Sequence, residues 1–178
     1  MHVIEDKITE LDKKMLRECV RVAHESKLNG NHPFGSVLAD KDGNILLEMQ
    51  NAFTEGGSAY HAETLLAFKA AKLYSPEFLS TCTLYTNFEP CVMCTGAIYW
   101  ANIGRLVYGA TEEQLLSYTG ANDENPTFSL DCRSVIEAGQ KDIKVAGPVA
   151  DEELINEICA DHIGFWKWVI FKNIYLIF

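Results

Sequence analysis

The sequence predicts a three-layer α/β/α fold built around a central mixed five-stranded sheet. Segments with helical periodicity alternate with short runs typical of strands, an Asp-Gly turn joins two of those runs, and a helical segment separates the third run from the fourth. The hairpin requires antiparallel pairing, whereas the helical crossover requires parallel pairing. We therefore expect a mixed sheet with helices on both faces.

The first half of the chain predicts a helix, a hairpin and a second helix. Apolar residues recur at helical spacing over residues 8–23, and Thr9 has the side chain of a helix cap at the start. Segments 36–39 and 45–49 flank the Asp-Gly turn, so we expect them to form the hairpin strands. A second amphipathic pattern over residues 62–73 predicts the next helix.

The middle of the chain predicts two strands joined by a helix. Residues 83–86 are typical of a strand, and Pro90 suits the first turn of a helix that continues to Trp100. Residues 105–108 predict the fourth strand. Because the connection between these strands is helical, we expect them to pair in parallel.

The last part of the chain predicts one more strand between two helices. Thr111 opens a short helix, and the polar segment 122–131 is expected to loop over another part of the molecule. Residues 143–146 supply the fifth strand. We expect a single domain over residues 1–178, with a C-terminal helix and an aromatic tail from about residue 151.

Two short motifs predict a catalytic zinc site. His61 and Glu63 form a His-x-Glu motif at one helix start, and Cys91 and Cys94 form a Cys-x-x-Cys motif at the next. The cysteines alone also fit a thioredoxin-like redox pair, but the His-x-Glu motif favours zinc. A structural zinc normally has four protein ligands, whereas a catalytic zinc has three. The partial positive charge at the start of each helix favours the thiolate form of the cysteines. Because Glu63 is not one of the three ligands, we expect its carboxylate to carry protons.

Both motifs together resemble the signature of the cytidine deaminase superfamily, and in particular the branch that holds guanine deaminase, cytosine-type deaminases and the tRNA adenosine deaminase. The resemblance runs from about residue 31 to residue 108 and includes Pro33-Phe34-Gly35, Asn51, and the segments 61–63, 89–94 and 96–100. It implies one Zn²⁺ per chain, held by His61, Cys91 and Cys94. It also implies that Glu63 moves protons from water to the substrate and to the departing amine.

The same resemblance implies substrate contacts beside the two motifs. Asn51 matches an asparagine that holds the ring, with a purely structural place at the hairpin end as the alternative. Phe34 matches one pocket wall, with a place in the core as the alternative. Ala62 and Pro90 complete this group. The segment 57–60 departs from the usual pattern of the family and leaves the substrate's identity open.

Further substrate contacts are expected from the second half of the chain. Asp123 and Glu124 lie where guanine deaminases carry an acidic residue that recognises the purine edge. Phe165 or Trp166 is expected to form an aromatic lid, because related deaminases cover the site with a C-terminal segment. Burial in the core or in a dimer interface is the alternative for these aromatic residues.

Composition narrows the expected function. Fifteen basic and twenty-five acidic residues give a net charge of −10, which disfavours binding to a phosphate backbone. The leading hypothesis is hydrolytic deamination of a free nucleobase or nucleoside of the guanine or cytosine type, with release of ammonia. A tRNA-specific adenosine deaminase is one alternative, and a non-catalytic zinc protein that binds a heterocycle is another.

The sequence also predicts location and assembly. The first residues lack the pattern of a signal peptide, so we expect a cytoplasmic protein. The apolar run 169–178 is too short and too interrupted to span a bilayer, so no membrane partner is expected. A small molecule is the expected ligand. Family resemblance favours a homodimer, and exchange of the C-terminal segment between subunits is one form that such a dimer takes.

Overall fold

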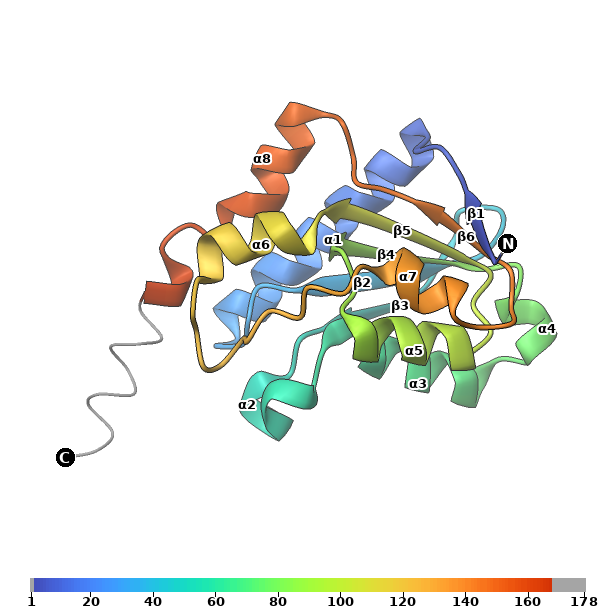
Figure 1. The fold of residues 1–178 in the computed structure, drawn as a ribbon, viewed down its shortest axis with the longest axis horizontal. Helices are drawn as coiled ribbons and strands as arrows, with labels where there is room; N and C mark the ends of the chain where they lie inside the picture. Colours follow the sequence, from blue (N-terminus) through green and yellow to red (C-terminus); the bar gives the residue numbers. More distant parts are fainter. Residues whose placement is uncertain (1, 168–178) are drawn as a thin grey trace.

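The computed structural model describes residues 2–167, and the tail 168–178 lies outside the described residues (Figure 1). The described chain forms one six-stranded sheet in which β2 alone runs against the other strands. Across the sheet the order is β1 (Val3–Glu5), β6 (Ile143–Ala146), β5 (Arg105–Ala110), β4 (Thr83–Phe88), β2 (Gly35–Ala39) and β3 (Ile45–Gln50). Within residues 2–167 we find no helix with the length and apolar character needed to cross a membrane.

Helices cover both faces of the sheet, as the sequence predicts (Figure 1). On one face α1 (Glu10–Leu28) packs against α8 (Glu152–Ala160), and on the other face α3 (Ala62–Leu73) packs against α5 (Val92–Trp100). The remaining helices are α2 (Phe53–Gly56), a 3-10 turn (Gly57–Ala59), α4 (Pro76–Leu79), α6 (Glu112–Thr119) and α7 (Cys132–Glu137).

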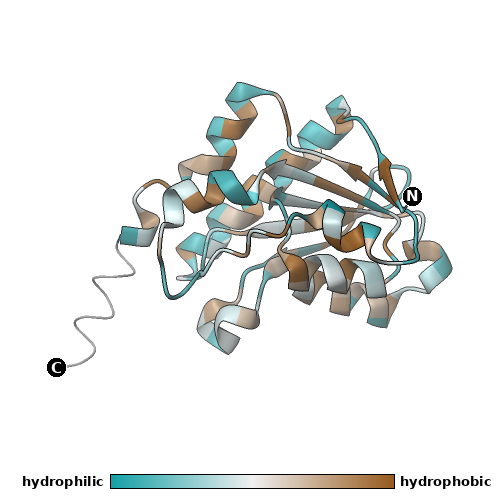
Figure 2. Cartoon of the chain, in the orientation of Figure 1, coloured by the Kyte–Doolittle hydropathy of each residue, from teal (hydrophilic) through white to brown (hydrophobic). Residues whose placement is uncertain are grey.

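The sheet separates two hydrophobic clusters, one under α1 and α8 and the other under α3 and α5. Alternate residues of the central strands face opposite sides, so Val37 belongs to the first cluster and Leu38 to the second. Figure 2 shows hydrophobic residues along the central strands and in α5. Because helices cover both faces of the sheet, every residue of β2 and β4 is buried.

The expected strand count of five is wrong by one strand. Residues Val3–Glu5 form β1, which pairs in parallel with β6 through Val3 and Ile143. Three residues are too few to display the alternation on which a strand prediction depends. The carboxylate of Glu137 accepts the backbone N–H groups of His2 and Val3, which fixes this strand from outside the sheet.

A buried ion pair joins α1 to the start of β5. Asp12 is 2% exposed, and its two carboxylate oxygens accept hydrogen bonds from Arg105 at 2.7 and 2.9 Å. The Tyr85 hydroxyl donates to the same carboxylate at 3.0 Å. Burial alone would raise the pKa of Asp12, but the hydrogen bonds from Arg105 and Thr9 more than offset burial and hold the pKa below its ordinary value.

We expect Asp12→Asn to lower the free energy of unfolding by about 3–5 kcal/mol at neutral pH, because Arg105 loses its buried counter-charge. Since the pKa of Asp12 is depressed in the folded state, the difference between wild type and variant should shrink as pH falls through that folded pKa. Urea unfolding measures both effects. The exposed Asp42→Asn is the matched control and should change stability by less than about 0.5 kcal/mol. An equally small change for Asp12→Asn would contradict the account.

Candidate active site

The first part of the site lies at the start of α3. His61 is the residue immediately before the helix, with extended backbone angles, and Glu63 lies in its first turn. The Glu63 side chain turns inward, so the residue is only 5% exposed. The sequence pattern His-x-Glu therefore places an imidazole and a carboxylate at one helix N-terminus, where partial positive charge stabilises anionic groups.

The second part lies at the start of α5, directly after β4. Cys91 is the residue before this helix, and Cys94 is fully buried in its first turn. His61 Nδ1 lies 3.6 Å from Cys91 Sγ and 3.4 Å from Cys94 Sγ. Zinc bonds of about 2.0 Å to nitrogen and about 2.3 Å to sulfur, at a tetrahedral angle, put these atoms about 3.5 Å apart.

The three side chains therefore fit a zinc ion. Their ligand atoms all lie within 4.8 Å of one another, and within residues 2–167 no fourth histidine, cysteine or acidic residue joins the group. Neutral imidazole and thiolate sulfur are the ligands that zinc prefers. A three-residue site with an adjacent carboxylate is typical of catalytic rather than structural zinc.

The two cysteine thiols have pKa values shifted in opposite directions. A hydrogen bond from Cys94 lowers the pKa of Cys91 to about 4 despite burial, and His61 adds to this effect. Burial raises the pKa of the Cys94 thiol well above its ordinary value, and the neighbouring Cys91 and Glu63 charges raise it further. Burial lowers the pKa of His61, but Cys91 and Glu63 outweigh it and raise the pKa overall. Metal binding at this site must therefore release a proton, as thiolate ligation requires.

Two hydroxyl groups hold the reactive atoms in place. Thr86 Oγ1, from β4, donates to Glu63 Oε1 at 2.5 Å, and Glu63 Oε2 lies 3.4 Å from Cys94 Sγ. Thr64 Oγ1 donates to Cys94 Sγ at 3.2 Å. The carboxylate is thus fixed beside the ligand cluster, with its orientation set by the sheet. Thr86 and Thr64 are not predicted from the sequence, because nothing in their local pattern distinguishes them from other buried threonines.

Two cavities meet at the ligands. The inner cavity, with a volume of about 20 Å³, has room for about one water molecule. The outer cavity has a volume of about 180 Å³. Both are bordered by the same four residues, His61, Cys91, Glu112 and Asn125. A larger groove of about 710 Å³ lies near β3 and includes none of the zinc-binding side chains.

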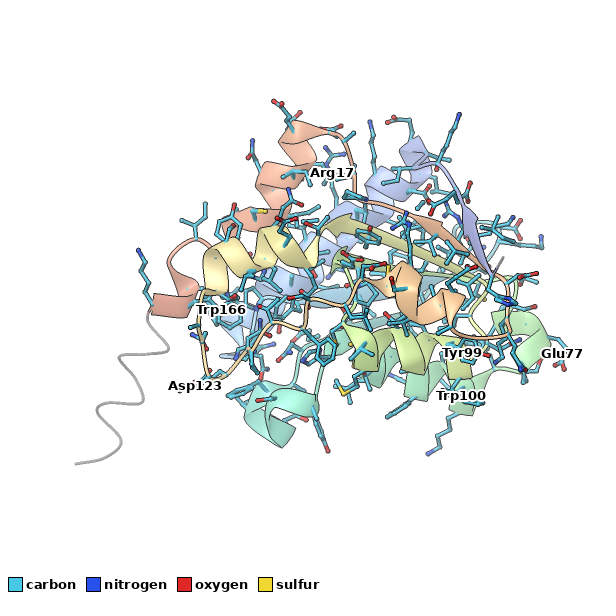
Figure 3. All side chains as sticks on the ribbon, viewed as in Figure 1. Arg17, Glu77, Tyr99, Trp100, Asp123 and Trp166 are labelled. Atoms are coloured by element: carbon cyan, nitrogen blue, oxygen red, sulfur yellow. The ribbon has the colours of Figure 1, made fainter. Side chains whose placement is uncertain are left out.

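The polar loop between α6 and α7 borders the site, whereas the sequence predicts only that segment 122–131 loops over another part of the molecule. Residues 124–128 line the outer cavity. Glu124 Oε2 lies 3.2 Å from His32 Nε2, and the Ser58 hydroxyl donates to the Glu124 carbonyl at 3.4 Å. Glu124 therefore borders the cavity, whereas the neighbouring Asp123 is exposed at the loop (Figure 3) and lines neither cavity.

The other expected contacts beside the motifs have different surroundings. Phe34 lines the inner cavity and also packs edge-on against Phe88, so it is both wall and core. Asn51 is buried, its Oδ1 accepts the N–H of Phe53 at 2.9 Å, and it lines neither cavity. Ala62 and Pro90 are buried beside the ligands and also line neither cavity. Direct contacts of these three residues with a substrate stay predictions.

The aromatic segment after α8 packs behind the pocket wall. Trp166 is 2% exposed, and its indole N–H donates to His162 Nδ1 at 3.2 Å (Figure 3). His162 Nε2 lies 2.9 Å from the Pro33 carbonyl, and burial lowers the pKa of His162 to about 3. The neutral imidazole therefore links Trp166 to the segment that carries Phe34. Phe165 contacts Trp166 edge-on, and a lid role for either residue stays a prediction.

Two pocket residues, Glu112 and Asn125, are also not predicted from the sequence. Glu112 follows Thr111, so its sequence context indicated only an acidic first turn of a helix. Burial raises the pKa of Glu112 to about 8, and the charges of Cys91 and Glu63 contribute to the increase. Asn125 belongs to a loop whose path depends on long-range contacts, which the sequence does not display.

Comparison with known proteins agrees with this geometry. A family model for the cytidine and deoxycytidylate deaminase zinc-binding region matches residues 9–110. A probable cytosine deaminase of Schizosaccharomyces pombe is 35% identical over 159 residues, covering 89% of this chain and 94% of the relative. The guanine deaminase of Bacillus subtilis is 42% identical over 97 residues, covering 53% of this chain and 62% of the relative.

Among solved structures, a guanine deaminase from Nitrosomonas europaea has the same fold. The TM-score is 0.67 at 24% sequence identity, and the match covers 84% of each chain. A likeness at that identity establishes the α/β architecture, including the mixed sheet.

The zinc site makes a direct prediction about metal content. Purified protein should hold one zinc per chain, and Cys91→Ala should lose most of it, because two remaining ligands bind zinc poorly. Thr64→Val removes the hydroxyl at Cys94 and should weaken zinc binding by about 10- to 100-fold. Elemental analysis and competition with a chelator measure these changes. Cys82→Ala, at a buried cysteine outside the site, is the control. Full zinc retention by Cys91→Ala would contradict the assignment.

Proposed function

The chain belongs to the cytidine and deoxycytidylate deaminase family, and on that premise we propose that it deaminates a free nucleobase or nucleoside of the guanine or cytosine type. Deaminases of this family are zinc-dependent hydrolases that act on carbon–nitrogen bonds. The observation that carries the proposal is the position of Glu63, whose carboxylate lies beside three zinc ligands and lines a cavity large enough for water. A relative named as a probable cytosine deaminase aligns along most of the chain and supports it.

The proposed reaction replaces an exocyclic amine by a carbonyl oxygen. Water supplies the oxygen, a carbon–oxygen bond forms at the ring carbon, the carbon–nitrogen bond breaks, and ammonia leaves. A zinc ion held by His61, Cys91 and Cys94 would lower the pKa of water at the site to about 7. The role of Glu63 is to accept a proton from the attacking water, deliver it to a ring nitrogen, and later protonate the leaving amine.

Thr86 keeps Glu63 in the position that this proton transfer requires. Its hydroxyl occupies Oε1 at 2.5 Å, which leaves Oε2 as the oxygen nearest the ligand cluster. A carboxylate held by a charge-assisted hydrogen bond needs little reorganisation during the reaction. Phe34, Phe88 and Leu115 form apolar walls of the inner cavity, which excludes bulk water from the transfer path.

The charge of the site supports a small neutral substrate rather than RNA. Glu112 and Glu124 both line the outer cavity, and the whole chain carries a net charge of −10. Acidic groups at the entrance oppose a phosphate backbone, from which nucleic-acid binders draw much of their affinity. The tRNA-specific adenosine deaminase of Haemophilus influenzae is 37% identical over 105 residues, covering 58% of this chain and 61% of the relative. Deamination of adenosine in tRNA is therefore the second candidate function.

We also propose a homodimer that forms through the outer surface of α3 and α5. This surface holds Tyr60, Phe68, Met93 and Trp100 around an apolar hollow of about 550 Å³, and Trp100 is 79% exposed (Figure 3). Exposed apolar patches of this kind are typical of protein interfaces. Met93 lies between the two cysteine ligands, so the interface adjoins the metal site. Exchange of the C-terminal segment and a cytoplasmic location stay proposals.

We expect the protein to release ammonia from cytosine or guanine, and their nucleosides are tested beside them. Glu63→Gln should lower kcat by about 100- to 10,000-fold while one zinc per chain stays bound, because the proton carrier is lost and the ligands remain. Thr86→Val should lower kcat by about 10-fold, and Thr86→Ser, which keeps the hydroxyl, should restore most of it. Ammonia release from a tRNA anticodon stem-loop alone would contradict the proposal, as would full turnover by Glu63→Gln.

We expect Phe68→Glu combined with Trp100→Glu to convert a dimer into monomers, because the charges would be buried in the apolar interface. Sedimentation velocity measures the change. Ile163→Glu, at a 69% exposed residue outside this surface, should leave the dimer intact. A monomeric wild type would rule out the proposed interface.

A further inference from the structure

Glu112 and Asn125 lie where the inner and outer cavities meet. Both side chains border both cavities, together with the zinc ligands His61 and Cys91. Glu112 and Asn125 therefore border the passage between the outer cavity and the ligands, where they can meet a ring that enters with its reacting carbon towards the ligands.

The backbone of Glu112 is firmly placed. Thr111 caps α6 by accepting the Gln114 N–H at 3.1 Å, and Gln114 Oε1 accepts the Thr111 N–H at 2.9 Å. Glu89 Oε2 accepts the N–H of Glu112 at 3.4 Å, and its other oxygen accepts the Cys132 N–H at 3.0 Å. Glu89 precedes the cysteine motif, so it ties the start of α6 to the metal site.

The backbone of Asn125 is held by a tight turn. Its N–H donates to the Asn122 carbonyl at 3.2 Å, and Asn122 Oδ1 accepts the Glu124 N–H at 2.9 Å. The Asn122 side-chain amide donates to the Trp166 carbonyl at 3.3 Å. The loop is thereby attached to the segment after α8, which presents Asn125 to the cavities in a defined position.

The polar ends of both side chains are open to a ligand. Over the described range 2–167, the Glu112 carboxyl and the Asn125 side-chain amide take part in no hydrogen bond or ion pair. Both residues are partly exposed, so their polar ends stay accessible from the cavities that they border. A carboxyl and an amide together suit a ligand that offers one hydrogen-bond donor and one acceptor.

We propose that Glu112 and Asn125 form a subsite that recognises adjacent N–H and C=O groups on the ring edge opposite the reacting carbon, and so selects free cytosine-type bases. The inference rests on the proposed deaminase function. A carboxyl oxygen accepts an N–H in either protonation state, and the asparagine amide donates to a carbonyl. Cytosine, attacked at C4, presents N1–H and C2=O on the far edge.

The same chemistry excludes close analogues. Cytidine and 1-methylcytosine carry a carbon substituent on N1, so the Glu112 carboxyl would meet no donor there. Adenine has no carbonyl for the Asn125 amide. A site that hydrogen-bonds a substrate group discriminates strongly against analogues lacking it, because its own polar atom is then left unpaired.

A purely structural role for Glu112 makes a different prediction. An acidic residue in the first turn of a helix stabilises the helix through the partial positive charge at its N-terminus, whichever substrate is present. Its removal would change the activity towards all substrates by the same factor. The ratio of kcat/KM between cytosine and 1-methylcytosine therefore separates recognition from stability.

The experiment compares cytosine with 1-methylcytosine on the zinc-loaded full chain. Wild type should prefer cytosine by at least about 10-fold, and Glu112→Ala should remove most of this preference by raising KM for cytosine about 10- to 100-fold. Glu112→Gln keeps an acceptor oxygen and should retain part of the preference. Asn125→Ala should raise KM for both compounds, since both have the carbonyl. The matched control is Glu113→Ala, at an exposed residue that borders neither cavity.

An unchanged preference in Glu112→Ala would overturn the subsite, and so would equal use of the two compounds by wild type. Turnover of guanine or of nucleosides alone would also overturn it while leaving the proposed deaminase function intact. If wild type with one zinc per chain released ammonia from no base or nucleoside, the proposed function itself would fail and the subsite with it. Zinc content of each variant, measured in parallel, separates loss of recognition from loss of metal.

Discussion

The site depends on the packing of α3 against α5, which brings the N-termini of two helices to one point. Each helix begins at a zinc ligand, so its N-terminal charge and the metal ligands coincide. His61 comes from one helix start and both cysteines from the other, and their ligand atoms converge to within 4.8 Å. Glu63 is carried into the same space by the first turn of α3. A shift of α3 relative to α5 would move His61 and Glu63 away from the two cysteines.

Hydrogen bonds from residues of the sheet and the loops hold this arrangement in place. Thr86 on β4 fixes Glu63, and Glu89 at the end of the same strand ties α6 and α7 to the metal site. His162 joins the aromatic segment after α8 to the wall that carries Phe34. The site therefore depends on elements far apart in the sequence, and the acidic residues Glu112 and Glu124 line its outer cavity.

Local signals in the sequence were enough for the main helices, five strands and the His-Cys-Cys group. Helix starts at Thr9, Thr111 and Asp151 follow from side chains that cap their own backbone, which is a local effect. Strand β1 was missed because its pairing partner lies near residue 143. The same reason explains why the sequence does not predict the roles of Thr86, Glu112 and Asn125. Tertiary contacts bring them to the site, and no spacing in the chain indicates those contacts.

The central claim is that one zinc ion at His61, Cys91 and Cys94 enables Glu63 to carry protons in the hydrolysis of an amino-heterocycle. Stepwise addition of Zn²⁺ to metal-free protein, with ammonia release from cytosine and guanine followed at each step, tests the claim most directly. The account predicts that activity rises in proportion to bound zinc and reaches its maximum at one ion per chain. Ammonia release by metal-free protein, or none at full zinc occupancy, would contradict it.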